Sequence, residues 1–168
     1  MIAYRGATPD DAPAIDALFR RSFIDTFGHL YDPRDLAAFL ARFTQAAWRG
    51  ELEDPDYAFR LAEDEGTLAG FAKISSVKLP VEPDAPAAEL RQLYVLGPWH
   101  GAGIASELMA WALAEARRRG AEELYLSVFV DNHRAGRFYA RHGFEAVGRY
   151  DFMVGDHADE DIVMRLKL

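Results

Sequence analysis

The spacing of apolar residues changes in the middle of the chain, between residues 90 and 120. Leu90–Leu96 is a short run with β-branched and aromatic residues at its centre, which is typical of a strand. A break at Gly97–Pro98 follows, and then a turn that contains Gly101 and Gly103. Apolar residues next recur every three to four positions as far as a basic end and Gly120, which is the spacing of an amphipathic helix. The segment therefore predicts a strand, a glycine turn and a long helix in succession.

The same two periodicities, together with turn residues, predict the remaining elements. Other strands are expected at Ile2–Arg5, Tyr57–Glu63, Leu68–Ser75, Leu124–Val130, Glu145–Phe152 and Asp161–Leu168. Other helices are expected from Pro9 to about Phe23, from Pro33 to Phe43, from Gln45 to Leu52 and from His133 to His142. This order predicts a single domain over residues 1–168 with an α/β fold, in which a mixed sheet carries helices on both faces.

Composition narrows the classes of function. The chain has 168 residues, half of them apolar, which is enough for one domain with a substantial core. It has no cysteine, which excludes disulfides and thiolate catalysis, and the spacing of its five histidines suggests no metal site. Nineteen basic residues against 27 acidic ones give a net charge of −8, which argues against a nucleic-acid partner. Charges interrupt every apolar run, so we expect no membrane span and a cytoplasmic protein.

The glycine turn before the long helix has the features of an anion site. The first backbone N–H groups of a helix lack partners within it, and the helix dipole is positive at that end. Gly101 and Gly103 have no Cβ, so a phosphate group can approach closely, and the turn predicts a diphosphate site. A dinucleotide-binding fold is the rival interpretation. It is disfavoured because Pro98–His100 separates the strand from the glycines, and because Ser106 stands where Gly or Ala is usual.

Two motifs match a known superfamily in the same order. Residues 100–105, His-Gly-Ala-Gly-Ile-Ala, resemble the Gln/Arg-x-x-Gly-x-Gly/Ala motif of the GNAT superfamily of N-acetyltransferases, with His100 where Gln or Arg is usual. Residues 132–144, Asn-x-x-Ala-x-x-Phe-Tyr-x-x-x-Gly-Phe, resemble its second motif. The resemblance covers essentially the whole chain. It implies acetyl-CoA as co-substrate, a mostly antiparallel sheet with splayed strands 4 and 5, and a possible homodimer.

Three shorter stretches are similar to the bacterial spermine/spermidine acetyltransferase group within this superfamily. They are Ser22–Phe27, Glu89–Val95 and Tyr150–Asp156. This similarity implies direct acetyl transfer to a small, cationic primary amine such as spermidine or spermine. The alternatives are acetylation of a protein N-terminus or lysine, and a noncatalytic acyl-CoA-binding sensor.

The resemblance also implies which residues contact the co-substrate. Backbone groups of Leu93, Tyr94 and Val95 would pair with the pantetheine arm, and the N–H of Val95 would hold the oxyanion. The residues expected around the pyrophosphate are His100, Gly101, Ala102, Gly103, Ile104, Ala105 and Ser106. Asn132 matches a position that contacts the co-substrate arm, and it is also a candidate helix N-cap.

Tyr139 and Glu89 are the candidates for proton transfer. Tyr139 matches the tyrosine that protonates the coenzyme A thiolate, and its alternative role is that of a core aromatic residue. Glu89 lies where several superfamily members carry a general base, and strict alternation would put it on one face of its strand with Leu93 and Val95. The alternative for Glu89 is a solvated carboxylate beside Arg91.

The acceptor side gives softer signals. Ser127 occupies the superfamily's alternative position for a base, so that variant of the mechanism is absent. Acids in segments that flank the acceptor cleft of such folds are candidates for binding a cationic amine, namely Asp25, Asp32, Asp35, Glu82, Asp84, Asp151 and Asp156. Three arginines after the second motif's helix start could meet the 3′-phosphate of coenzyme A or form a solvated face, namely Arg134, Arg137 and Arg141. Tyr31, Trp99 and Tyr150 would line the cleft or complete the core.

Overall fold

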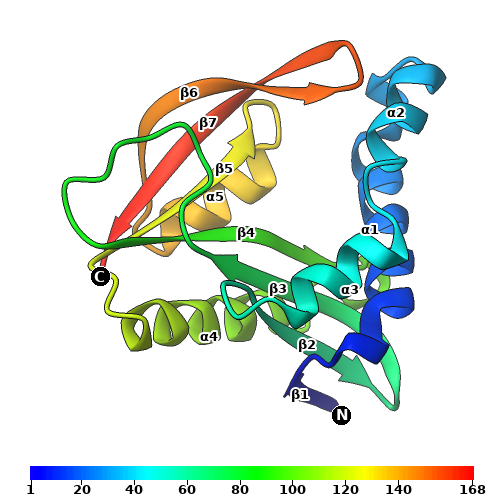
Figure 1. Cartoon of the computed structure of the whole chain (residues 1–168), viewed down its shortest axis with the longest axis horizontal. Coiled ribbons are helices and arrows are strands. Elements are labelled where there is room, and N and C mark those ends of the chain that lie inside the picture. The colour runs from blue at the N-terminus through cyan, green and yellow to red at the C-terminus, as the bar shows by residue number, and fades with distance from the viewer.

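The computed structural model describes all 168 residues, as seven strands and five α-helices, with a long loop between Ser75 and Ala87 (Figure 1). The strands are β1 (Ile2–Gly6), β2 (Ala58–Asp64), β3 (Thr67–Ser75), β4 (Ala87–Val95), β5 (Glu123–Phe129), β6 (Glu145–Val154) and β7 (His157–Lys167). The helices are α1 (Ala12–Phe27), α2 (Pro33–Leu40), α3 (Gln45–Glu53), α4 (Ile104–Arg118) and α5 (His133–Arg141). Every element predicted from the sequence is present, in the predicted order.

All strands belong to one sheet, in the order β1-β2-β3-β4-β5-β7-β6. Neighbouring strands are antiparallel, except that β4 and β5 run parallel. These two pair only through Ala87–Glu89 against Glu123–Tyr125 and then diverge, and we call the diverging part the fork. The mixed, mostly antiparallel sheet with splayed central strands is thus confirmed. Inside the fork each strand turns backbone groups toward the other without pairing.

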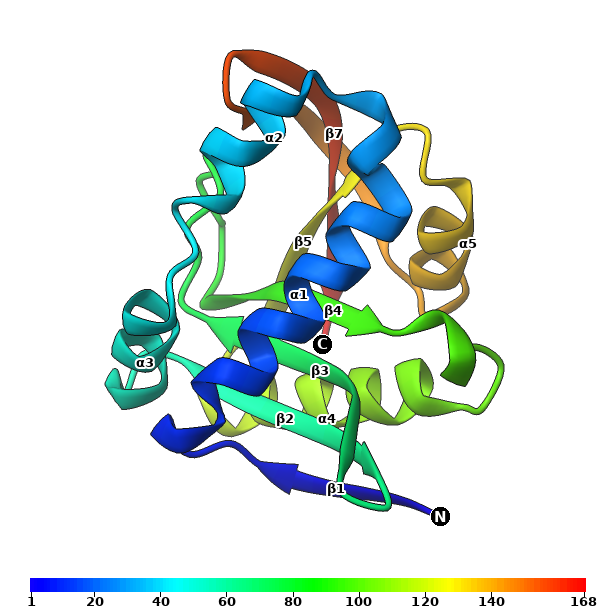
Figure 2. The same cartoon turned by 90° about the vertical axis from the view of Figure 1, so that its right-hand side faces the viewer.

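The helices cover both faces of the sheet, each face over its own apolar core (Figures 1 and 2). On one face α4 packs against the sheet through Ile104, Leu108 and Met109, and α5 packs at the edge of the same core. On the other face α1, α2 and α3 enclose an aromatic cluster whose buried members include Phe19 and Trp48. None of the helices combines the length and apolar character that crossing a lipid bilayer requires.

The start of β7 differs from the prediction. Apolar alternation predicted a strand from Asp161, whereas β7 begins at His157, directly after a turn at Gly155 with φ of 59°. Pairing with β6 holds the additional residues in the strand, with Val154 opposite His157 and Phe152 opposite Asp159. Cross-strand pairing overrides local polarity here. Asp159 and Asp161 therefore lie inside a paired strand, and both are buried.

Candidate active site

A cavity of about 540 Å³ opens at the fork between β4 and β5. Both splayed strands line it, together with α1, the first turn of α4, α5 and the first half of β7. It passes through the sheet, because Leu93 and Tyr139 of its wall belong to the α4 core while Phe23 and Tyr31 belong to the α1 core. We call the part at the start of α4 the α4 end, and the part formed by Tyr31, Ser127, Asp159 and Asp161 the β7 end.

At the α4 end, a row of backbone N–H groups has no acceptor in the protein. The hydrogen bond that opens α4 runs from the N–H of Glu107 to the C=O of Gly103, at 3.2 Å, so the N–H groups of Gly103–Ser106 stay unpaired. Gly101 and Gly103 both have φ of 81°, a left-handed conformation that other residues adopt at a cost. Unpaired donors at a helix start favour an anion, so these residues fit the diphosphate of coenzyme A.

Ala102 differs from the other residues of the turn. Its N–H donates to the C=O of Trp99 at 3.3 Å, and it does not line the cavity. Ala102 therefore shapes the turn from behind rather than offering a donor to a phosphate, which corrects its predicted role as a direct contact.

His100 ties three elements together. Its Nε2 lies 2.7 Å from the C=O of Val95 at the end of β4, and its Nδ1 lies 2.6 Å from Nη1 of Arg134 on α5. Because arginine only donates, Nδ1 accepts and Nε2 carries the hydrogen that Val95 accepts. The side chain that replaces the usual Gln or Arg thus braces the turn against α5 and the strand end. It also lines the cavity.

The backbone of β4 alternates between its neighbour and the fork. The N–H of Leu96 donates to the C=O of Ala69 at 2.9 Å. In an antiparallel ladder this turns the backbone groups of Val95 and Leu93 away from β3, into the fork. Those of Tyr94 face β3 instead, which corrects the predicted pairing of its backbone with the pantetheine arm.

Helix α5 contributes Asn132 and Tyr139 to the wall of the cavity. The side chain of Asn132 caps α5 by accepting the N–H of Ala135 at 3.3 Å, so it is a cap that also faces the cavity. Burial raises the pKa of Tyr139 to about 12, which keeps its phenol protonated at neutral pH. Of the three arginines on α5, Arg134 and Arg141 line the cavity and Arg137 does not.

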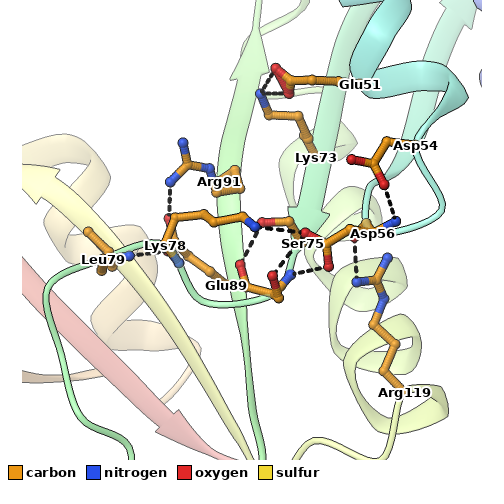
Figure 3. Close-up of polar contacts among 11 residues, drawn as sticks. Glu51, Asp54, Asp56, Lys73, Ser75, Lys78, Leu79, Glu89, Arg91 and Arg119 are labelled. Carbon is orange, nitrogen blue, oxygen red and sulfur yellow. Dashed lines mark hydrogen bonds and ion pairs between the residues drawn. The ribbon is translucent and has the colours of Figure 1, made fainter.

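Glu89 lies outside the cavity, in a site that occupies its whole carboxylate (Figure 3). Its Oε1 accepts the N–H groups of Lys78 and Leu79 at 2.8 and 2.9 Å, and its Oε2 accepts Nη1 of Arg91 at 2.8 Å. It is 3% exposed, so the alternative of a solvated carboxylate is wrong as well. Glu89 holds the loop after β3 against the sheet, and the structure gives it no access to a substrate.

A β-bulge explains why alternation misplaced Glu89. Lys73 of β3 lies opposite Gln92, while the next residue, Ile74, lies opposite Leu90, so that Arg91 is the additional residue. The bulge reverses the alternation. Leu90, not Glu89, shares the α4 face with Leu93 and Val95.

The β7 end contains two carboxylates that the sequence did not single out. Asp159 and Asp161 are each 6% exposed and line the cavity. Asp159 accepts the hydroxyl of Tyr31 on Oδ2, and its Oδ1 lies 3.1 Å from Nε2 of His157. Asp161 lies between Phe129 and Tyr150 in a row across three strands, and it forms no ion pair. Burial and then the charge of Asp159 raise the pKa of Asp161 to about 7, against a hydrogen bond from Ser127.

The acids expected at the acceptor cleft lie elsewhere. Asp32, Asp35 and Asp156 line a separate hollow between α2 and the β6–β7 turn. Asp25, Glu82, Asp84 and Asp151 line neither space. Among the aromatic candidates, Tyr31 and Trp99 do line the cavity. The available signal for Asp159 and Asp161 was their Asp-x-Asp spacing. Had the last strand been predicted to include both residues, alternation would have placed their side chains on the same face of the sheet.

Comparison with known proteins agrees with this geometry. Residues 13–144 match the acetyltransferase (GNAT) family. An uncharacterized N-acetyltransferase of Mycobacterium tuberculosis is 34% identical over 155 residues, which are 92% of this chain and 96% of that protein. The aminoalkylphosphonate N-acetyltransferase of Salmonella typhimurium is 32% identical over 141 residues, 84% of this chain and 83% of that protein.

The fold also matches solved structures along its whole length. The PaiA N-acetyltransferase from Thermoplasma acidophilum, solved in complex with coenzyme A, has a TM-score of 0.80 at 21% identity, covering 100% of this chain and 99% of that one. A family match over most of the chain, together with unpaired N–H groups where that family's motif lies, decides the assignment. The chain belongs to the GNAT family and is an N-acetyltransferase that uses acetyl-CoA as its co-substrate.

Proposed function

We propose that the acceptor is the primary amine of a small cationic molecule. The observation that carries this proposal is a single cavity with unpaired N–H donors at one end and two buried carboxylates at the other. No lysine or arginine pairs with either carboxylate. Asp161 has no basic partner at all, and a buried carboxylate of this kind is costly, so an ammonium ion in the cavity would offset that cost.

The residues of the cavity suit direct transfer. Acetyl-CoA supplies the acetyl thioester, and its diphosphate fits the N–H groups of Gly103–Ser106. The N–H of Val95 faces the fork, where it can stabilise negative charge on the carbonyl oxygen. Tyr139 keeps its proton at neutral pH and is the group we assign to protonate the departing sulfur.

A polyamine such as spermidine is our finer proposal for the acceptor. An alkyl ammonium with pKa roughly 10 is charged at neutral pH and suits Asp159 and Asp161. The separate hollow of Asp32, Asp35 and Asp156 also contains Arg34, which pairs with Asp32, so the proposal rests on Asp159 and Asp161 alone. The short resemblance to the spermine/spermidine acetyltransferase group agrees with this choice.

An amine with an anionic group is the second candidate. Arg91 lines the cavity and donates Nη1 to Glu89, which leaves its other N–H groups free for a phosphonate. The relative from Salmonella typhimurium is named for acetylating aminoalkylphosphonates. The two acceptors would bind to side chains of opposite charge in the same cavity, the polyamine to Asp159 and Asp161 and the phosphonate to Arg91.

An amine panel separates these candidates. The purified protein is incubated with acetyl-CoA and with spermidine, a monoamine of equal length, an aminoalkylphosphonate, a free lysine derivative or a peptide with a free N-terminus, and thiol release is followed. We expect spermidine to have a lower KM than the monoamine. A preference for the phosphonate that is lost in Arg91→Met would replace the polyamine. Tight acetyl-CoA binding without thiol release for any amine would refute the proposed function and favour the sensor.

A further inference from the structure

An alkyl ammonium must lose a proton before its nitrogen can attack a thioester. Within the proposed function, the proton acceptor must therefore line the cavity. Its titratable side chains apart from the arginines are His100, Asp159, Asp161 and three tyrosines. Glu89 is excluded because it does not reach the cavity.

Most of these groups are already committed. Both ring nitrogens of His100 are bonded within the protein, and both oxygens of Asp159 are engaged by Tyr31 and His157. The tyrosines have pKa values raised by burial, so they hold their protons and do not accept another at neutral pH.

Asp161 remains. It is only 6% exposed and it lines the cavity. No lysine, arginine or histidine forms an ion pair with it. The titratable groups that face it come from four elements or segments: Asp159 beside it on β7, Tyr150 on β6, Tyr94 on β4 and Tyr31 between α1 and α2. Ser127 of β5 supplies a hydroxyl, 3.2 Å from that of Tyr150.

We infer that Asp161 is the general base of the reaction, and that Asp159 is the fixed anion that helps to hold the acceptor ammonium beside it. This inference rests on the proposed function. The division follows from hydrogen bonding, because both oxygens of Asp159 are engaged, by Tyr31 and His157, while the one side-chain hydrogen bond to Asp161 comes from Ser127 and leaves room for a proton.

The step balances as follows. Asp161 takes one proton from the ammonium, and the freed nitrogen lone pair forms the C–N bond while the C–S bond breaks. Tyr139 gives its phenolic proton to the sulfur, and the second proton lost by the nitrogen restores the phenol. Asp161 finally releases its proton to solvent, so one proton is released per acetyl group transferred.

The shifted pKa agrees with this role. Burial and the neighbouring charge of Asp159 raise the pKa of Asp161 to about 7, so it is substantially ionised at neutral pH and still basic enough to accept a proton. A base must be deprotonated, so kcat/KM should rise with pH through about 7 and then fall as the ammonium ion loses its proton in solution, near pH 10.

The test is the pH profile of Asp161→Asn beside a matched control, Glu160→Gln. Glu160 is the neighbouring residue of β7 but is exposed and paired with Arg149, outside the cavity. We expect Asp161→Asn to lower kcat/KM at pH 7 by about 10²-fold or more, with a rate that keeps rising toward pH 10 as free amine accumulates. Glu160→Gln should keep the profile of the natural protein, and calorimetry should show unchanged acetyl-CoA affinity in both variants.

Two further outcomes separate the inference from the proposed function. If the natural protein acetylates an amine and Asp161→Asn retains both its rate and the limb near pH 7, Asp161 is not the base and the function stands. If the natural protein acetylates no amine, both fail. Carbon NMR titration of the natural protein needs no variant: a carboxyl of Asp161 that titrates near pH 4 would overturn the inference, and one near pH 7 supports it.

Discussion

The two ends of the cavity differ in the kind of group that forms them, backbone N–H groups at one end and side chains at the other. The α4 end is made of consecutive backbone N–H groups at the start of one helix, from Gly103 to Ser106. The β7 end is made of side chains that are far apart in the chain, such as Tyr31 between α1 and α2, Ser127 of β5 and Asp161 of β7. The first is local and depends on backbone conformation. The second depends on register and burial, so a shift of one residue in a strand would dismantle it.

This difference predicts how each end fails when it is changed. A substitution at the α4 end should act through backbone conformation and the space for a phosphate. A substitution at the β7 end should act through charge and proton transfer. Glu89 and Tyr139 test a further distinction, because Glu89 lies outside the cavity, at the last paired position before the fork, whereas Tyr139 lines the cavity.

Gly103→Val should have the largest effect. A Cβ at Gly103 meets no protein atom within 4 Å, so it projects into open space rather than into the core, but a branched residue is strained at φ of 81°. We expect acetyl-CoA affinity to fall by at least about 10²-fold, about 2.7 kcal/mol or more. Calorimetry measures this, and Gly103→Asn, which tolerates the left-handed region better, is the milder control. Equal losses in both variants would contradict a role for the conformation of Gly103.

Glu89→Ala should destabilise the protein without a specific effect on catalysis. The change leaves the N–H groups of Lys78 and Leu79 and the guanidinium of Arg91 without their carboxylate. The free energy of unfolding should drop by about 2–3 kcal/mol in urea denaturation. The folded fraction should keep the pH profile of the natural protein. Loss of the limb near pH 7 in Glu89→Ala, with stability retained, would restore Glu89 as the base.

Tyr139→Phe should reduce turnover and leave binding intact. The substitution removes the phenolic proton but keeps the ring that packs against Phe138 and Phe144. We expect kcat to fall about 10- to 100-fold, or about 1.4–2.7 kcal/mol, with the dissociation constant of acetyl-CoA unchanged. Single-turnover kinetics at saturating amine measures the chemical step. An unchanged rate would remove Tyr139 from proton transfer.

Asp161→Asn should stabilise the protein at alkaline pH while it impairs catalysis. The pKa of Asp161 is raised from 3.8 to about 7, so stability is lost as pH rises through this window. The variant escapes that loss. Above pH 7 it should gain about 1–2 kcal/mol over the natural protein, and near pH 4 the difference should disappear. Thermal unfolding of both proteins at pH 4, 6 and 8 checks this. A stability difference that does not depend on pH would show that the pKa of Asp161 is not raised by folding.

The sequence was a good guide wherever local pattern decides structure. The strand, glycine turn and helix from residue 87 to 118 follow directly from apolar spacing and glycine placement. The dual position of Asn132, capping α5 and facing the cavity, was also within reach of the motif and its N-cap chemistry.

It was a poor guide wherever two strands had to be aligned. Strict alternation along β4 predicted that Glu89 and Leu93 share a face of the sheet, because the local sequence does not reveal the bulge at Arg91. The start of β7 was set too late for a related reason. Its first residues are polar and are in the strand because they pair with β6, and the local sequence contains no sign of that pairing.

The amino-acid sequence alone determined the order of the elements, the glycine turn before α4 and the family, because each depends on residues that are close in the chain. Only the tertiary structure decided which carboxylates face the cavity. A bulge turned Glu89 into the loop after β3, while pairing among β5, β6 and β7 buried Asp161 in the cavity without a cation. The physical reason is that burial and charge pairing are properties of neighbours in space, and in a sheet those neighbours are chosen by register.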